Sequence, residues 1–280
     1  MSELDVRTGE RTVHVWDSGA GSALTLVWHH GSPQTGAPLE PVARWAAERG
    51  IRLVSYGRPS YGGSTPQPGR TIGDAAADVA AILDELGIDR FATMGASGGG
   101  PHALACGALL AGRVIGIVCL AGIAPYTSEF DWFAGMASPD DVRSALGGRD
   151  ARAARVAQSE WNSENFNAGD YAALEQTWGS LGQDVARADE AGPDGLIDDD
   201  VAIVTPWGFA LDAVTPPTLL AQGGDDRVVP RAHAEWMLEQ LPHGELWLRP
   251  RDGHIGVLNA APVAMDWLLS VATGAAASTT

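Results

Sequence analysis

The sequence contains no lysine. All 18 basic residues are arginine, and 35 acidic residues leave a formal net charge of -17. The absence of lysine excludes catalysis through a lysine Schiff base. The acidic balance disfavours partners that are themselves polyanions, so we expect no nucleic-acid partner and no membrane partner. A small molecule is therefore the expected partner of this chain.

Cysteine is almost as scarce, since Cys106 and Cys119 are the only two. Both lie in apolar runs, as buried reduced thiols do, and they do not have the spacing of a zinc site. We therefore expect neither a metal nor another cofactor. The first five residues lack the basic and apolar regions of a signal peptide, and no apolar run reaches the length of a membrane span. These features predict a cytoplasmic protein and leave open a homo-oligomer.

A regular alternation of strand and helix patterns fills much of the chain. Its 280 residues, 45% of them hydrophobic, are enough for a sizeable core. Continuous apolar runs, typical of strands buried on both faces, alternate with amphipathic helical runs. The expected strands are residues 12–16, 24–28, 51–56, 91–94 and 114–120, and the expected helices are 39–49, 71–86 and 98–110. This order predicts an α/β fold with a mostly parallel central sheet, helices on both faces, and ligands at the carboxyl ends of the strands.

The strand pattern is interrupted in the second half of the chain. Residues 126–205 contain no clear buried strand, and strands resume at 218–221 and 245–248. Within the interruption we expect helices at 138–146, 151–161 and 171–187, and a short segment capped by the aspartates at 198–200. We therefore divide the chain into a core domain, 1–125 and 206–280, and a helical cap insertion, 126–205. A turn at 17–21 and a small-residue tail at 274–280 complete the expected elements.

One motif, Gly95-Ala96-Ser97-Gly98-Gly99, fits the pattern G-x-S-x-G. An apolar strand run leads into it and an alanine-rich helical run leaves it. A strand-to-helix turn this tight needs residues without side chains on either side of the serine, and it leaves the serine exposed in a strained pose. Ser97 is therefore a candidate nucleophile, although a plain Gly/Ser turn also fits the motif.

A serine nucleophile needs a base in contact with it, and the base needs an acid that fixes its tautomer. Asp226 follows the strand that ends at Ala221, and His254 follows the strand that ends at Leu248. Both residues are thus expected at the same edge of the sheet as Ser97. The order Ser, Asp, His along the chain is the one that accompanies G-x-S-x-G at such a turn.

Together these motifs make the chain resemble the α/β-hydrolase superfamily, as a serine hydrolase with an inserted helical cap, nearly from end to end. The segments that carry the resemblance are 30–33 (His-Gly-Ser-Pro), 95–99, 223–230 (Gly-Gly-Asp-Asp-Arg-Val-Val-Pro) and 253–254 (Gly-His). One departure is Gly57, where many relatives have an aspartate before the Arg58-Pro59 pair. The change concerns a structural salt link and leaves the proposed catalytic residues intact.

The resemblance assigns roles to further residues. It implies that Asp226 is the acid of a catalytic triad with Ser97 and His254; from the residues alone, Asp225 remains an alternative. It also implies that the backbone N–H groups of Gly98 and Ser32 form an oxyanion hole. His29 and His30 lack a nearby carboxylate cluster, so a metal site there is disfavoured and His30 is expected to shape the oxyanion loop.

The expected chemistry is acyl transfer on an ester or a related substrate with an apolar acyl or alcohol group. Aromatic residues of the insertion indicate an apolar pocket, although more than half of them are expected only to pack the cap onto the core. We expect His30, Trp132, Trp207 and Phe209 to line the substrate pocket; Phe133, Trp161 and Trp178 are further aromatic residues of the region.

Other functions use the same residues. The alternatives are a C–C bond hydrolase, a cofactor-free perhydrolase, an aminopeptidase, and a receptor of this fold that binds a small molecule without turning it over. An aminopeptidase needs carboxylates that hold a free amine. The candidates are Glu160, Glu164, Asp170 and Glu175, all of which are also typical of solvated helix faces.

Overall fold

The computed structural model describes residues 1–19 and 24–277. Its described part contains an eight-stranded sheet in the order β1-β2-β4-β3-β5-β6-β7-β8. The strands from β4 to β8 in that order run parallel, while β1 and β2 pair antiparallel at one edge. The prediction of a mostly parallel sheet is confirmed. The strands are β1 Ser2–Thr8, β2 Arg11–Asp17, β3 Leu24–His29, β4 Ile51–Tyr56, β5 Phe91–Ala96, β6 Val114–Leu120, β7 Thr218–Gly223 and β8 Gly244–Arg249.

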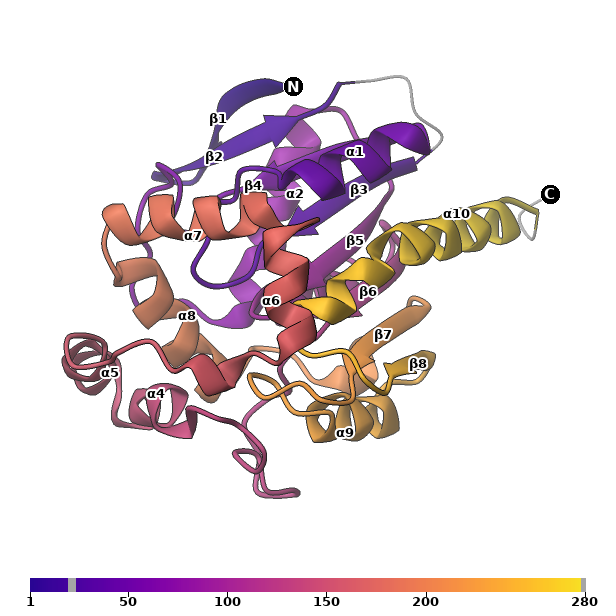
Figure 1. Ribbon diagram of the computed structural model, residues 1–280. Helices are drawn as coiled ribbons and strands as arrows, with labels where there is room; N and C mark the ends of the chain where they lie inside the picture. The colour runs from indigo at the N-terminus through magenta and orange to yellow at the C-terminus, as the bar shows by residue number, and fades with distance from the viewer. Residues whose placement is uncertain (20–23, 278–280) are drawn as a thin grey trace.

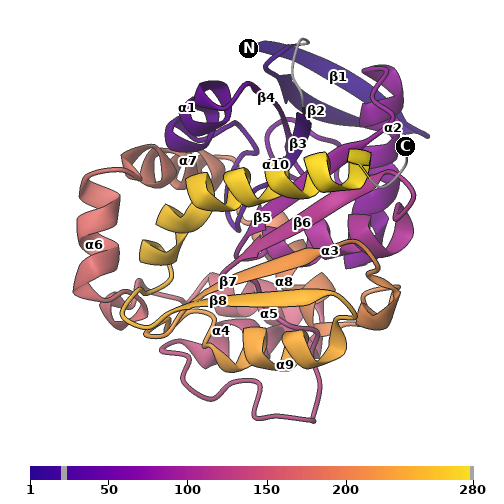
Figure 2. The same cartoon turned by 90° about the vertical axis from the view of Figure 1, so that its right-hand side faces the viewer.

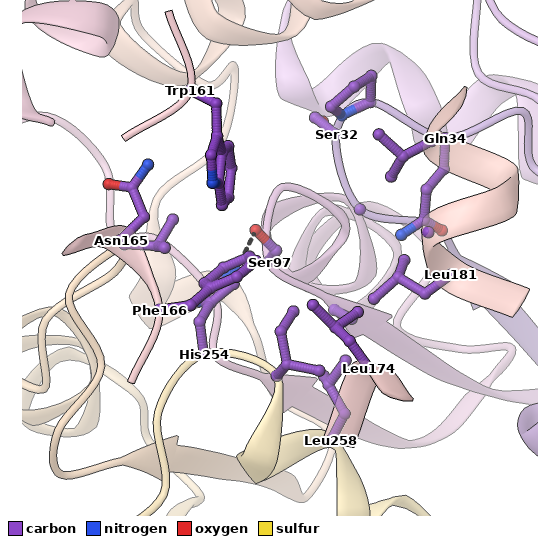
Figure 3. Close-up of a pocket in the computed structure, with 17 residues that line it drawn as sticks. Ser32, Gln34, Ser97, Trp161, Asn165, Phe166, Leu174, Leu181, His254 and Leu258 are labelled. Atoms are coloured by element: carbon purple, nitrogen blue, oxygen red, sulfur yellow. Dashed lines mark hydrogen bonds between the residues drawn. The ribbon is translucent and has the colours of Figure 1, made fainter. Parts of the chain in front are cut away.

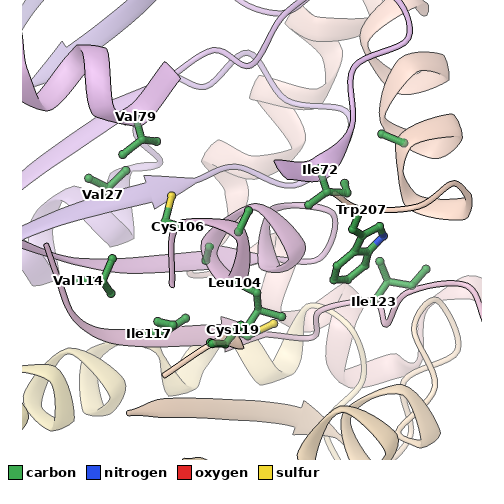
Figure 4. Packing of buried hydrophobic residues seen from close by; sticks show 14 of the residues in the cluster. Val27, Ile72, Val79, Leu104, Cys106, Val114, Ile117, Cys119, Ile123 and Trp207 are labelled. Atoms are coloured by element: carbon green, nitrogen blue, oxygen red, sulfur yellow. The ribbon is translucent and has the colours of Figure 1, made fainter. Parts of the chain in front are cut away.

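Helices cover both faces of this sheet (Figure 2). Successive strand residues point to opposite faces, so Leu26 and Trp28 join one buried cluster and Val27 joins the other. Figure 4 shows part of the second cluster, around Val27 and Cys106. The first cluster is covered by α1 (Glu40–Glu48) and α10 (Ala261–Ala277), the second by α2 (Ala75–Glu85), α3 (Gly99–Leu109) and α9 (Ala232–Gln240).

The segment between β6 and β7, residues 121–217, is helical wherever it has regular structure in the described chain. This segment contains the cap expected at 126–205, and from here on we call all of residues 121–217 the insertion. Its helices lie beside the carboxyl ends of the strands (Figure 1). They are α4 Pro139–Arg143, α5 Arg149–Val156, α6 Ala168–Glu175, α7 Gly179–Glu190 and α8 Asp194–Val204.

Two expectations for the insertion are wrong. The single helix expected at 171–187 is two helices, α6 and α7, because the chain turns at 176–178 and buries Trp178 against Trp45. The aspartates at 198–200 lie inside α8 and are buried, so they do not cap it. Carboxylates that were expected to cap a helix are thus buried, and Asp199 pairs with Arg58 and Arg70 of the core domain.

The ends of the chain differ from expectation as well. The strand β1 was not predicted, because its residues are mostly exposed and alternate only weakly. Part of the turn expected at 17–21 lies outside the described residues. The expected tail is helical as far as Ala277 and lies outside the described residues beyond it.

Helix α10 and the turn before it, Gly256–Gly274, are long and apolar enough to cross a membrane by length and composition, with a mean hydropathy of 1.2. The expectation that no run reaches this length is therefore wrong for this stretch. Ala264, Met265 and Leu268 are fully buried, and the helix packs along β6. Its apolar side is accordingly part of the core.

Candidate active site

Ser97 occupies the sharp turn between β5 and α3. Its φ angle of 52° lies in the left-handed region, which is costly for a residue with a side chain. The turn tolerates no side chain at position 95, because a Cβ at Gly95 would overlap the backbone of Gly99. The Ser97 amide donates to the carbonyl of Leu120 at 2.8 Å, which ties the turn to β6. The local sequence thus forces the serine into the predicted pose.

The structure brings Ser97, His254 and Asp226 together from three loops at the carboxyl edge of the sheet. The Nε2 atom of His254 lies 3.0 Å from Ser97 Oγ, and its Nδ1 atom lies 2.8 Å from Asp226 Oδ2 (Figure 3 shows the serine–histidine pair). Asp226 follows β7 and His254 follows β8. With the Nδ1 proton donated to the carboxylate, Nε2 is free to accept the serine proton.

The carboxylate of Asp226 is fixed by its own turn. Its Oδ1 atom accepts the amides of Val228 and Val229, both at 2.9 Å, and Oδ2 also accepts Gln222 Nε2 at 3.1 Å. Asp225 points elsewhere: its side chain is 47% exposed and accepts from Asn167 at 3.0 Å. Of the two neighbouring aspartates, only Asp226 reaches His254.

The environment of His254 favours its protonated form. Burial alone would lower the pKa of this imidazole, but the charge and hydrogen bond of Asp226, with a smaller contribution from Asp170, outweigh burial and raise the pKa above its ordinary value of 6.5. Asp170 belongs to α6 and is almost completely buried. Its Oδ1 atom accepts the amides of Ile255 and Gly256, both at 2.8 Å, so the insertion holds the histidine loop directly.

Gly98 and Ser32 line the same space beside Ser97. A Cβ built on Gly98 would lie 2.6 Å from Ser32 Oγ and 3.8 Å from Ser32 N. In the described part of the chain neither amide has a hydrogen-bond acceptor. Two adjacent N–H groups without a partner are what an oxyanion needs.

His30 supports this loop from behind. The amide of Arg58 donates to His30 Nε2 at 3.2 Å, which places the ring proton on Nδ1, where it is donated to the carbonyl of Gly31 at 2.7 Å. Burial and the charge of Arg58 hold the pKa of His30 well below its ordinary value, so the ring is neutral. His30 therefore contacts the loop at Gly31, and its role in shaping an oxyanion hole stays a prediction.

A buried ionic cluster joins the loop to the insertion. Asp199, in the middle of α8, accepts from Arg58 Nη2 at 2.5 Å, Arg70 Nη2 at 2.7 Å and Tyr61 Oη at 3.0 Å, and it also accepts from the hydroxyl of Ser32. Burial alone would raise the pKa of Asp199, but the two arginines hold it well below the ordinary value. The insertion thus supplies a buried carboxylate partner for Arg58 and Arg70.

Two cavities open beside Ser97. The larger, of about 390 Å³, is mainly apolar and is lined by residues of the oxyanion and histidine loops together with the insertion. Figure 3 shows Trp161 and Phe166 on one side of Ser97, and Leu174 and Leu258 on the other. The lining includes Gln34, Trp161, Phe166, Leu174, Leu181, Val185, His254, Ile255 and Leu258.

The smaller cavity, of about 270 Å³, lies against Ser97, Gly98 and Ser32 and carries more polar groups. The charged side chains in its lining are Asp141, Arg152, Asp200 and Arg227. None of these four residues was expected at the site, although Asp200 belongs to the 198–200 run and Arg227 to the 223–230 segment. They come from α4, α5, α8 and the loop after β7, segments whose proximity only the fold reveals.

The four residues expected in the substrate pocket line neither of these cavities. His30 is fully buried behind the oxyanion loop. Trp132 donates its indole N–H to the carbonyls of Ala124 and Pro125, both at 3.1 Å, and packs on the buried His233. His30 and Trp132 are both part of the core, because their ring nitrogens find hydrogen-bond partners there.

The expectation that Trp207 and Phe209 line the substrate pocket is also wrong. Trp207 donates to the carbonyl of Ile203 at 3.0 Å and packs near Ile72 and Ile123 in the buried cluster (Figure 4). With Phe209 it borders a separate surface hollow beside Pro125 and Tyr126, and Ser97 is not part of that hollow. The aromatic residues that line the apolar cavity are Trp161 and Phe166, and Trp161 is 64% exposed.

The acidic residues considered for binding an amine do not form a cluster around one point. Asp170 is buried and occupied by the histidine loop, whereas Glu160, Glu164 and Glu175 are exposed. Within residues 1–19 and 24–277, no group of three or more His, Cys, Asp or Glu side chains is arranged to hold a metal ion.

Comparison with known proteins points to one family. A family model described as the alpha/beta hydrolase fold matches residues 25–261. A non-heme chloroperoxidase of Streptomyces lividans is 25% identical over 84% of this chain and 90% of its own length. Among solved structures, an esterase from Thermogutta terrifontis has a TM-score of 0.73 and 19% sequence identity, and the match covers 97% of this chain and 99% of the esterase chain. An enol-lactonase from Burkholderia xenovorans has a TM-score of 0.72 and 19% sequence identity, and the match covers 96% of this chain and 100% of the enol-lactonase chain.

Proposed function

The chain belongs to the α/β-hydrolase family, and on that premise we propose that it is a carboxylesterase-like serine hydrolase. The observation that carries the proposal is the 3.0 Å contact between Ser97 Oγ and His254 Nε2 at the edge of an apolar cavity, with His254 held by Asp226. The esterase and the enol-lactonase with the same fold act on ester bonds by name, and this supports an ester or lactone as substrate.

The proposed reaction has two halves. In the first, Ser97 Oγ attacks the carbonyl carbon while its proton passes to His254 Nε2, and the amides of Gly98 and Ser32 donate to the oxyanion. His254 then gives that proton to the leaving oxygen, and an acyl group remains on Ser97. In the second half, water attacks the acyl carbon while one of its protons passes to His254; the bond to Ser97 Oγ then breaks, His254 returns the proton to Ser97, and the acid is released.

We propose that residues 126–205 act as a cap that covers the apolar group of the substrate. Trp161, Phe166, Leu174 and Leu181 come from this segment and line the larger cavity. Burying an apolar side chain of ordinary size there is worth about 1.5–3 kcal/mol, so the cavity favours acyl or alcohol groups without charge.

The test is covalent labelling. Folded protein treated with a fluorophosphonate probe is expected to carry the adduct on Ser97, and Ser97→Ala is expected to carry none. The same two proteins are then assayed with p-nitrophenyl esters of increasing acyl length. Absence of labelling at Ser97 in folded protein contradicts the proposal.

A second candidate is peracid formation, which the chloroperoxidase name of a relative favours. Hydrogen peroxide would then replace water in the second half: its oxygen attacks the acyl carbon, Ser97 leaves with its proton restored, and a peracid is released. The measurement is the ratio of peracid to acid formed from one ester in the presence of hydrogen peroxide. A ratio that stays near zero leaves the esterase as the function.

A further inference from the structure

Ser97 lies between two cavities of opposite character. His254 lines the larger, apolar cavity and is absent from the lining of the smaller one, which borders Gly98 instead. Because His254 must protonate the leaving oxygen, the leaving group has to lie on the side of the apolar cavity. The acyl part, which stays bonded to Ser97, is then directed toward the smaller cavity.

The smaller cavity contains a buried arginine that is only partly satisfied. Arg152, on α5, is 5% exposed, and its Nε donates to Asp200 Oδ2 at 2.6 Å. Among the described residues neither terminal nitrogen, Nη1 or Nη2, has a hydrogen-bond acceptor; Nη1 is sealed from solvent, whereas Nη2 is not. Donors of a buried side chain nearly always have a partner, so the accessible Nη2 of a guanidinium in the wall of this cavity indicates an acceptor that a ligand brings.

The charges around Arg152 decide which acceptor fits. Arg152 and Arg227 face Asp141 and Asp200 in the same lining, so the formal charges cancel. Burial raises the pKa of Asp200 to about 6, even against the opposing charge of Arg152, and above that pH the carboxylate neutralises the guanidinium. A ligand carboxylate would meet two carboxylates there without a surplus of positive charge. A neutral oxygen takes the free N–H groups without adding charge.

We propose that the smaller cavity binds an acyl group bearing a neutral carbonyl oxygen, which accepts a hydrogen bond from Arg152. This inference rests on the proposed serine hydrolase function. The substrate class is an oxo-acyl ester with an apolar leaving group, and Arg152 determines its specificity.

Matched pairs of esters test the proposal on the unaltered protein. One pair is p-nitrophenyl 4-oxopentanoate and p-nitrophenyl pentanoate, and the second is the 6-oxoheptanoate and the heptanoate; both share one apolar leaving group. A hydrogen bond to a charged donor predicts a kcat/KM for the better oxo ester about tenfold above its alkyl partner. If Ser97-dependent hydrolysis occurs but neither oxo ester is preferred, this inference is wrong and the hydrolase function stands. If no ester is hydrolysed and Ser97 is not labelled, the proposed function itself is wrong.

A charge-conserving variant assigns the preference to Arg152. Arg152→Lys keeps a cation beside Asp200 and removes the guanidinium fork, so the oxo-to-alkyl ratio of kcat/KM should fall toward one. Arg155→Lys is the matched control, since Arg155 is on the same helix, pairs with Asp141 at 2.8 Å and does not line the cavity. An oxo preference that survives in Arg152→Lys, or mono-p-nitrophenyl glutarate outperforming every oxo ester on the unaltered protein, overturns the proposal.

Discussion

Asp170 Oδ1 accepts a hydrogen bond at 2.8 Å from the backbone amide of Ile255, the residue that follows His254. The same carboxylate helps to raise the pKa of the histidine. Asp170→Asn retains an acceptor oxygen and removes the charge, so the acidic limb of kcat/KM should move to lower pH. The measurement is the pH profile of the variant beside that of the unaltered protein.

Asp170→Ala removes the acceptor as well. It leaves the buried amides of Ile255 and Gly256 without a partner, at a cost of about 1–3 kcal/mol for each group. Urea denaturation should therefore separate the alanine variant from the asparagine variant. Glu175→Gln, on the exposed end of the same helix, serves as control and should leave both the profile and the stability unchanged.

The second prediction concerns the pH dependence of the unaltered protein. The proposed base acts as a neutral imidazole, and its pKa is raised above 6.5 because the Asp226 carboxylate outweighs burial. Protonation on acidification thus begins at a higher pH than for a free histidine, and kcat/KM should fall with a midpoint above 6.5. A profile that stays flat to about pH 5, where a free imidazole is already protonated, contradicts His254 as the base.

The third prediction separates the two neighbouring aspartates. Asp226→Asn removes the charge that orients and stabilises the His254 imidazolium, so kcat should fall by roughly four orders of magnitude. Asp225→Asn changes a half-exposed residue whose partners are Asn167 and Arg227, and its kcat should stay near that of the unaltered protein. Steady-state kinetics on one p-nitrophenyl ester decides the matter, and a reversed order of the two effects would assign the acid to Asp225.

Sequence patterns predicted the sheet and the positions of Ser97, Asp226 and His254 because the signals involved are local. Apolar runs identify buried strands, and glycines beside a serine identify a tight turn. Residues that follow parallel strands must lie at one edge of the sheet, whatever the details of packing. Topology therefore brings three distant loops together without any knowledge of the side chains between them.

The contacts that the side chains of the insertion make with the core domain could not be predicted in the same way. Asp199 and Ser32 are 167 residues apart, yet they share a hydrogen bond in the core. A run of aspartates on a helix is ordinarily solvated, and only the approach of Arg58 and Arg70 makes burial of Asp199 favourable. For the same reason the contacts of Arg152 and Asp170 could not be predicted from the sequence, because their surroundings come from other elements.

The fourth prediction tests this ionic cluster. Asp199→Asn has almost the same shape but leaves Arg58 and Arg70 as buried charges without a carboxylate, which should cost about 3–5 kcal/mol of folding stability. Asp194→Asn, at the exposed start of the same helix, removes a surface pair with Arg149 and should cost less than about 1 kcal/mol. Urea denaturation of both variants gives the comparison, and equal stabilities would mean that the cluster contributes nothing net.

The last prediction concerns Gly98, whose amide is one of the two proposed oxyanion donors. A methyl group there would lie 2.6 Å from Ser32 Oγ. The hydroxyl of Ser32 cannot retreat easily, because it is bonded to Asp199 and accepts from Arg58 Nη2 at 3.0 Å. Gly98→Ala should therefore separate the two amides and lower kcat by roughly 100- to 1,000-fold, the loss expected for one oxyanion donor, with a smaller change in KM.

Gly182→Ala is the matched control for this variant. Gly182 lies on α7 and lines the apolar cavity, and an added Cβ there meets no atom of the described residues within 4 Å. The control should keep its kcat and report only the effect of an extra methyl group near the substrate. If Gly98→Ala retains the kcat of the unaltered protein while still labelling at Ser97, the oxyanion hole does not depend on this pair of amides, and the donors must be sought elsewhere along the loop.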